Sequence, residues 1–453
     1  MTDTNSIAFG DSSAGAAVAL PDLPAVESSR QESARTASFP PPPREPNSLS
    51  EAGISEADLD ALVLKNLLQL GNSTGGQIAV ELCLPRLLVN DSLERLREEL
   101  LVSIKMAAGV GDYLFQLTDA GFNRARQHAA RSNYVGAAPV PLASYTLAIG
   151  HQSIQNADLD LDRLSTAFSD MKLEPKLLSR LAQAINDGRG MFLFGSPGNG
   201  KTTIAERICD AFGEYLWIPR MIGIGGDLIR LFDPSCHQPV EAPQLEEMKY
   251  DRRWVLIHRP TVVVGGELTL DQLDTNYNQS TGISEAPVHL KANGGALVID
   301  DFGRQRVSST DILNRLIVPL EKHFDFLNLA SGRQIQVPFD LLFVLSTNLE
   351  PRELVDEAFL RRIPYKIEVA DPTEMEFRSL FAVLAQKAGF GCDPRTIDYL
   401  IDRHYRAENR AMRFCHPRDF LRQIKNYCSV HDLPSQITTE CVDVAVENYF
   451  AAI

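Results

Sequence analysis

The chain has 453 residues, of which 44% are hydrophobic, so it is long enough for two or three compact domains rather than one small module. Its formal net charge of −15 would repel nucleic acid over most of the surface, so any binding to DNA requires a locally basic patch. The seven cysteines form no C-x-x-C pair and favour neither a disulfide framework nor a zinc site. No apolar run reaches transmembrane length, and we expect a cytoplasmic protein without membrane insertion.

Residues 1–50 are predicted to form a disordered tail. They are dominated by Ser, Ala, Thr and Pro, contain the run Phe39–Pro43 and lack a helical or strand period, so they cannot bury enough apolar surface to fold. The proline run could act as a tether or as a short docking peptide in polyproline conformation. A plain flexible extension is the favoured interpretation.

Residues 51–134 have the pattern of a winged-helix domain. An apolar-periodic helix, a short helix and a third helix through Leu101 precede two strand-like segments, Val102–Met106 and Tyr113–Leu117, around a Gly-rich tip. Three helices followed by such a hairpin are typical of a winged helix. Thr118 is expected to cap the helix that comes next.

The third helix of this module, the usual reader of a DNA groove, is acidic. Acids along that face would meet phosphates unfavourably, so docking to a protein is favoured and binding to DNA is the alternative. The helix carries four acids, Asp91, Glu94, Glu98 and Glu99, against two bases, Arg95 and Arg97.

Two further domains follow a linker. Residues 135–158 are interpreted as the linker, since their prolines exclude helix. Over residues 159–371, apolar runs of strand length alternate with helical segments, which predicts an α/β domain whose parallel sheet has helices on both faces. Residues 372–453 have helical periods only and predict a separate all-α domain. The strand candidates are Met191–Phe194, Leu297–Asp300, Leu341–Ser346 and Tyr365–Val369.

The strongest motif directly follows the first of these strands and precedes a helix expected to begin at Thr203. It matches G-x-x-x-x-G-K-[ST], a loop whose glycines let backbone N–H groups surround a phosphate. Lys201 would place its charge on the β- and γ-phosphates, and the Thr202 hydroxyl would ligate Mg²⁺, so ATP and Mg²⁺ are the expected cofactors. The residues expected to bind the nucleotide are Gly195, Ser196, Pro197, Gly198, Asn199, Gly200, Lys201, Thr202 and Thr203.

The second strand candidate ends in two acids, Asp300 and Asp301. A buried parallel strand can hold Asp300 at its carboxyl edge, where it would meet the Mg²⁺ shell. Asp301 could then orient or deprotonate the attacking water. An ordinary strand end with solvated acids is the alternative, but the order of the two motifs along the chain favours a catalytic pair.

With these motifs in this order, the chain resembles the AAA+ ATPases over roughly Leu159–Ile453. Ser346-Thr347-Asn348 looks like sensor 1 of that family, which implies that Asn348 contacts the γ-phosphate or the attacking water. A hairpin candidate over residues 326–337 is similar to the hairpin before sensor 1 in the MoxR-like branch. The sequence departs from the family at Asp301, where Glu is usual, and this puts the rate of hydrolysis in question.

The resemblance also implies roles for three arginines. Asp356–Ile363 looks like the arginine-finger segment, which reaches the ATP of the adjoining subunit, and Arg362 is favoured over Arg361 as the finger. An exposed basic pair at a helix end is the alternative. His416–Asp419 looks like sensor 2, with Arg418 reporting the nucleotide to the helical lid.

These elements together predict a ring-forming ATPase. The resemblance implies a self-associated ring, expected to be a hexamer, that couples ATP binding and hydrolysis to the remodelling of an unknown protein partner. Two alternatives stay open: a DNA-binding or transcription regulator that uses the winged helix, and a nucleotide-binding scaffold with weak turnover.

Overall fold

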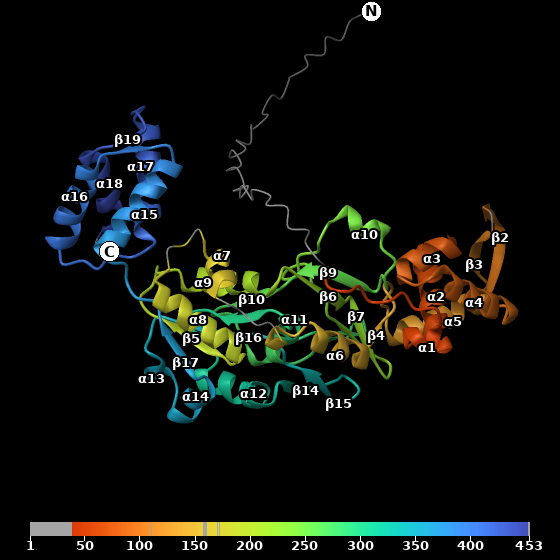
Figure 1. Cartoon of the computed structure of the whole chain (residues 1–453). Helices are drawn as coiled ribbons and strands as arrows, with labels where there is room; N and C mark the ends of the chain where they lie inside the picture. Colours follow the sequence, from red (N-terminus) through yellow and green to blue (C-terminus); the bar gives the residue numbers. More distant parts are fainter. Residues whose placement is uncertain (1–38, 110, 157–160, 170, 172, 452–453) are drawn as a thin grey trace, which may run out of the picture. The chain divides into compact units, whose positions relative to one another are not determined.

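The computed structural model describes residues 39–451 except residues 110, 157–160, 170 and 172 (Figure 1). Most of the predicted tail therefore lies outside the described residues, as do Val110 at the predicted hairpin tip and Leu159, where the AAA+ resemblance begins. Within the described part of the chain, no helix is both long enough and apolar enough to cross a membrane.

The N-terminal module consists of helices packed on a small antiparallel sheet of order β1-β3-β2. Its predicted hairpin is present, and Thr118 caps the following helix by accepting a hydrogen bond from Gly121 N at 3.1 Å. The third helix ends before Leu101 because Leu100 adopts a left-handed φ of 56°. The elements are α1 (Leu49–Ala52), α2 (Glu56–Leu70), β1 (Ser73–Thr74), α3 (Gly75–Leu82), α4 (Arg86–Glu98), β2 (Val102–Gly109), β3 (Asp112–Leu117) and α5 (Asp119–Arg131).

Within the predicted linker, residues 140–141 are extended as expected, but a helix that the pattern did not predict follows them. The extended pair is β4, which joins a second sheet of order β11-β12-β8-β7-β4, and β6 pairs with β9 beside it. The elements of this region are β4 (Val140–Pro141), α6 (Leu142–His151), η1 (Ile154–Asn156), β6 (Tyr215–Pro219), β7 (Met221–Ile224), β8 (Asp227–Arg230), α10 (Pro243–Glu247), β9 (Trp254–His258), η3 (Leu270–Leu273), β11 (Asn276–Asn278), β12 (Ile283–Glu285) and α11 (Val288–Lys291).

The central sheet is entirely parallel and has the order β10-β13-β16-β5-β17. Four of its strands are the predicted ones, with ends that differ by one residue at most. The fifth, β10, was missed, although its run of Thr and three valines is typical of a buried strand. The strands are β5 (Met191–Phe194), β10 (Thr261–Val264), β13 (Ala296–Ile299), β16 (Leu342–Thr347) and β17 (Tyr365–Glu368).

Helices cover both faces of this sheet, which confirms the predicted α/β fold (Figure 1). Met191 and Leu193 point to one face, where they pack with α7 (Leu161–Ala167), α8 (Pro175–Asp187) and α9 (Lys201–Ile208). Phe192 points to the other face, because side chains alternate along a strand. The helices around that second core are α12 (Ser309–Lys322), α13 (Pro351–Leu354) and α14 (Glu357–Arg362). The hairpin β14 (Phe324–Asn328) and β15 (Gln334–Pro338) belongs to a separate core with β6, β7 and β8, and η2 (Cys209–Phe212) follows α9.

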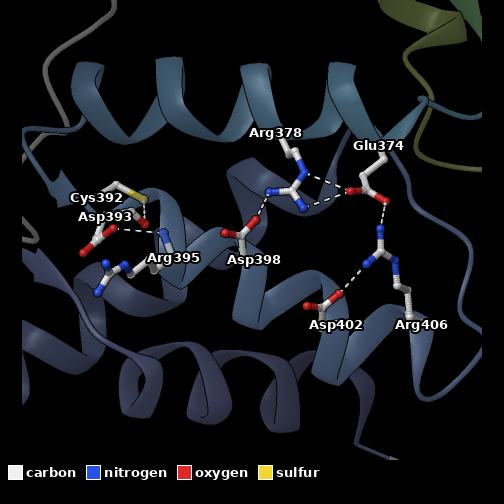
Figure 2. Close-up of polar contacts among 8 residues, drawn as sticks. All are labelled: Glu374, Arg378, Cys392, Asp393, Arg395, Asp398, Asp402 and Arg406. Atoms are coloured by element: carbon white, nitrogen blue, oxygen red, sulfur yellow. Dashed lines mark hydrogen bonds and ion pairs between the residues drawn. The ribbon is translucent and has the colours of Figure 1, made fainter.

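The residues after the sheet form a helical domain, as predicted. It also contains one parallel pair of two-residue strands, so the expectation of helix alone was wrong in this detail. A chain of ion pairs on its surface links Asp398, Arg378, Glu374, Arg406 and Asp402 (Figure 2). Its elements are α15 (Glu374–Lys387), β18 (Gly391–Cys392), α16 (Pro394–Leu400), the π-helix η4 (Ile401–Arg406), α17 (His416–Val430), β19 (Gln436–Ile437) and α18 (Thr439–Phe450).

Candidate functional site

The predicted phosphate loop lies between the carboxyl end of β5 and the first turn of α9. Gly198 and Gly200 adopt left-handed φ angles of 83° and 82°, which a side chain would disfavour. A Cβ on Gly195 would lie 2.4 Å from the carbonyl oxygen of Val369, so this position also requires glycine. The helix begins at Lys201 rather than at Thr203, which lies within its first turn.

Lys201 is buried within this loop, with 7% of its surface exposed. Its Nζ donates hydrogen bonds to the carbonyl oxygens of Gly195 at 2.9 Å and Ser196 at 3.0 Å, and to Asn348 Oδ1 at 2.7 Å. Burial lowers the pKa of the Lys201 ammonium group, although nearby Asp300 and other acids oppose this shift. The ammonium group therefore sits in a polar pocket of the loop that an anion would stabilise.

Thr202 and Asp300 meet directly at the carboxyl edge of the sheet. The Thr202 hydroxyl donates to Asp300 Oδ2 at 2.8 Å. Hydroxyl and carboxylate oxygens are ligands that Mg²⁺ prefers, and it commonly takes only one or two protein ligands together with phosphate oxygens and water. This donor set fits Mg²⁺ held jointly with a nucleotide, although the described residues contain no cluster of three or more His, Cys, Asp or Glu that could hold a metal alone.

Asp301 lies next to Asn348, as the order of the two strands requires. Asn348 Nδ2 donates to Asp301 Oδ1 at 3.1 Å. Asp301 has a left-handed φ of 48°, a conformation in which Asp and Asn are several-fold enriched. Gln305, which the sequence did not single out, donates to the carbonyl oxygens of Asp300 at 3.0 Å and Asp301 at 3.3 Å and so supports this turn.

A second polar network, which the sequence did not reveal, joins the loop to the helical domain. Asn199 Nδ2 donates to Asp371 Oδ1 at 2.7 Å, and Asp371 also forms an ion pair with Arg413. Burial acts to raise the pKa of Asp371, but hydrogen bonds from Asn199 and Arg413 outweigh it and hold this pKa below its usual range. The backbone N–H of Cys415 donates to Gly198 O at 3.0 Å, so the start of α17 touches the loop itself.

The three predicted arginines lie in different surroundings. The side chain of Arg418 is 75% exposed and pairs with the adjacent Asp419 at 3.3 Å. Arg362 pairs with Glu321 at 2.6 Å, and Arg361 is exposed. The roles given to these arginines stay predictions, since a finger acts on the nucleotide of another subunit.

A groove of about 790 Å³ lies beside the phosphate loop and not within it. It is bounded by Phe194 at the end of β5 and by the finger segment, including Arg361. Its other charged lining residues are Glu350, Arg352, Glu357, Lys366 and Glu368.

Comparison with protein families identifies one match, which covers only part of the chain. A domain family of unknown function, DUF8689, matches residues 373–448, which is the helical domain alone. No curated protein matches the sequence.

The fold and the loop together define a P-loop α/β protein with a nucleotide-binding fold.

Two solved structures illustrate how distant the similar proteins are. The RuvB Holliday junction branch migration motor of Thermotoga maritima is 13% identical with a TM-score of 0.36, over 61% of this chain and 69% of that one. NtrX from Brucella abortus is 14% identical with a TM-score of 0.39, over 64% of this chain and 59% of that one. Likenesses at this level concern the fold alone.

Proposed function

We propose that this protein is an Mg²⁺-dependent ATPase of the AAA+ class that works as a ring and remodels a protein partner. The observation that carries the proposal is the meeting of four side chains at one edge of the sheet: Lys201 with Asn348, and Thr202 with Asp300. These side chains follow the carboxyl ends of three strands, β5, β13 and β16. Each side chain has a functional group that phosphoryl transfer requires.

In this proposal the phosphates of ATP take over the hydrogen bonds that Lys201 now makes to loop carbonyls. Thr202 and Asp300 would hold Mg²⁺, which when bound would neutralise charge on the phosphates. Asp301 orients or deprotonates the attacking water, and Asn348 holds the Asp301 carboxylate in place while it contacts the γ-phosphate. Most of the catalysis is then positioning and electrostatic stabilisation.

The helical domain would act as a nucleotide-sensing lid. This role is supported by the network Asn199–Asp371–Arg413, in which Asp371, just before the helical domain, contacts both the phosphate loop and an arginine of that domain. Arg413 is close enough to lower the pKa of Lys201, after the larger effect of burial. Arg413 therefore joins Arg418 as a candidate for the arginine that reports the nucleotide.

Docking to a protein is the role proposed for the N-terminal winged helix. The acidic face of α4 supports it, as do Ile104, Met106 and Tyr113, which are exposed apolar residues on the hairpin. DNA binding is the second candidate, favoured by three exposed arginines on α5, which are Arg124, Arg126 and Arg131.

Three measurements test the proposal on the full chain. ATP turnover should require Mg²⁺, and sedimentation should show assembly into a ring when ATP and Mg²⁺ are added. Fluorescence anisotropy with random duplex DNA at physiological salt should show little binding, because the chain has a net charge of −15. Absence of Mg²⁺-dependent ATP turnover would reject the proposal, and submicromolar, salt-sensitive DNA binding would favour the regulator over the protein remodeller.

A further inference from the structure

The proline run at residues 40–43 is bound to β6 and to the segment that directly precedes β9. Trp217, on β6, donates a hydrogen bond from its indole Nε1 to the carbonyl oxygen of Pro40 at 3.0 Å. The backbone N–H of Asp251 donates to the carbonyl oxygen of Pro43 at 2.9 Å. With the run in this position, Trp217 is only 1% exposed. The proline run therefore makes specific main-chain contacts and is not a plain flexible extension.

The spacing of these two contacts matches a polyproline II helix. That helix has three residues per turn and no internal hydrogen bonds, so carbonyl groups three residues apart face the same side and are free to accept. Residues 39–46 adopt neither helix nor strand, and Pro41, between the two accepting residues, is exposed. Pro40 and Pro43 thus present their carbonyl oxygens to the protein, while Pro41 faces solvent.

The receiving surface carries two neighbouring aromatic rings. The rings of Trp217 and Tyr250 lie with their centroids 5.0 Å apart and their planes at 48°. Aromatic-lined grooves recognise proline-rich segments because the segment is preformed and loses little entropy on binding. A tryptophan suits such a site in general, since an indole ring can pack on proline while its N–H donates to a carbonyl group, as Trp217 does to Pro40.

The second donor is held rigidly by a buried ion pair. Arg253 Nη2 donates to Asp251 Oδ2 at 2.7 Å, and each of these residues is 3% exposed. Arg253 Nη1 also donates to the carbonyl oxygen of Ala52 at 2.7 Å, so the end of α1 is bound to this ion pair. The Asp251 amide is therefore fixed in position before any ligand arrives.

We propose that Trp217, Tyr250 and the Asp251 amide form a binding site for polyproline II segments, and that its ligand is the chain's own Pro40–Pro43. The site holds the end of the predicted tail against the nucleotide-binding domain beside the attachment of α1. The inference is independent of the ATPase proposal, because no residue of the phosphate loop takes part in it.

The first experiment opens the site in the full chain by replacing residues 40–43 with Gly-Ser-Gly-Ser. A fluorescein-labelled peptide of residues 39–47 should bind the opened chain, measured by anisotropy, and should not bind the wild-type chain. A peptide with its prolines replaced by alanine should bind weakly. In the opened chain, Trp217→Phe keeps an aromatic ring but removes the N–H donor, and it should weaken peptide binding about fivefold.

A second measurement uses the intact proline run, so it does not depend on how the opened chain folds. Arg44 is exposed directly after the run, and trypsin cleavage there should be several-fold faster in Trp217→Phe than in wild type. Trp254→Phe makes the same change on the paired strand and should leave cleavage unchanged. The proposal is overturned if the opened chain does not bind the peptide, if Trp217→Phe binds it equally well, or if both variants are cleaved at the wild-type rate.

Discussion

The ammonium group of Lys201 donates to the side-chain oxygen of Asn348 at 2.7 Å. The two residues follow adjacent strands of the sheet: Lys201 lies beyond the loop after β5, and Asn348 directly follows β16. The amide group of Asn348 also donates to Asp301, so it bridges the phosphate-loop lysine and the proposed water-orienting acid. A change at the γ-phosphate would therefore reach both residues through one side chain.

Replacing Lys201 with alanine should abolish ATP binding. The change removes the one lysine that the loop places on the phosphates, and hydrogen bonds to charged groups contribute about 1.5–3 kcal/mol each. We expect affinity to fall at least about a hundredfold. Titration with a fluorescent ATP analogue measures this, and Lys387→Ala, at an exposed lysine of α15, is the control. An affinity near that of wild type would refute the assignment of the phosphate loop.

Asp301→Asn should separate ATP binding from hydrolysis. Asparagine tolerates the left-handed φ of 48° as well as aspartate does, so the turn should keep its shape. It cannot accept a proton from water, and loss of a general base costs about 10²–10⁴-fold in rate. Steady-state turnover and analogue binding should be compared in the same preparation. Turnover equal to wild type would exclude Asp301 as the base.

Asp301→Glu tests why this chain has aspartate where the AAA+ ATPases that it resembles usually have glutamate. Glutamate is not among the residues enriched at positive φ, so we expect this variant to lose thermal stability relative to Asp301→Asn. Aspartate then fits this turn better than the longer acid does. A melting temperature equal to that of wild type would show that the backbone does not select aspartate here.

The sequence predicted the parts of the site that depend on short motifs. The strand, the glycine-rich loop and the helix are contiguous in the chain, so a short pattern identifies them. Because the carboxyl ends of parallel strands meet at one edge of a sheet, the sequence also predicted that Lys201, Asp300 and Asn348 lie close together. Arg413 could not, because its ion pair with Asp371 depends on how the helical domain folds back. The contact of Pro40 with Trp217 spans 177 residues and leaves no local pattern.

Two arginines of the helical domain can be compared directly. Arg413→Ala should weaken ATP binding more than Arg418→Ala does, because Arg413 pairs with Asp371 beside the loop whereas the side chain of Arg418 is 75% exposed. We expect a loss of several-fold for Arg413→Ala and little change for Arg418→Ala. The opposite order would restore Arg418 as the reporting residue.

The helical domain should lose stability as the pH falls. Burial, aided by Arg413, lowers the pKa of His416 to about 4, and Tyr405 Oη lies 2.7 Å from its Nδ1. An unfolded histidine has a pKa near 6.5, so the unfolded state binds the proton first and the folded state loses stability from about pH 6.5 down to about pH 4. The loss amounts to about 3 kcal/mol at the lower end.

Urea midpoints at several pH values can isolate this effect. His416→Gln cannot take up the proton, so its midpoint should fall less between pH 6.5 and pH 4 than that of wild type. Carboxyl groups elsewhere in the chain begin to bind protons toward the lower end of this range, which is why the difference between the two chains is the quantity to measure. If the urea midpoints of wild type and His416→Gln fall equally with pH, His416 does not cause the pH dependence.

Arg362→Ala should leave ATP binding nearly intact while strongly lowering turnover, if Arg362 is the finger. A finger stabilises charge at the γ-phosphate of the neighbouring subunit in the transition state and contributes about 10³–10⁵ in rate. Arg362 pairs with Glu321 in the single chain, whereas Arg361 is exposed, so Arg361→Ala is the matched comparison. Turnover should fall with only one of the two substitutions.

Mixing two inactive variants gives the sharper test of a shared site. Lys201→Ala lacks a working pocket but keeps its finger, and Arg362→Ala keeps its pocket, so a mixed ring contains interfaces where an intact pocket meets an intact finger. Mixing should therefore restore part of the ATPase activity, in proportion to the number of interfaces at which an intact pocket meets an intact finger. If the mixture stays as inactive as either parent although mixed rings form, or if Arg362→Ala alone turns over at the wild-type rate, Arg362 is not the finger and Arg361 is tested in the same way.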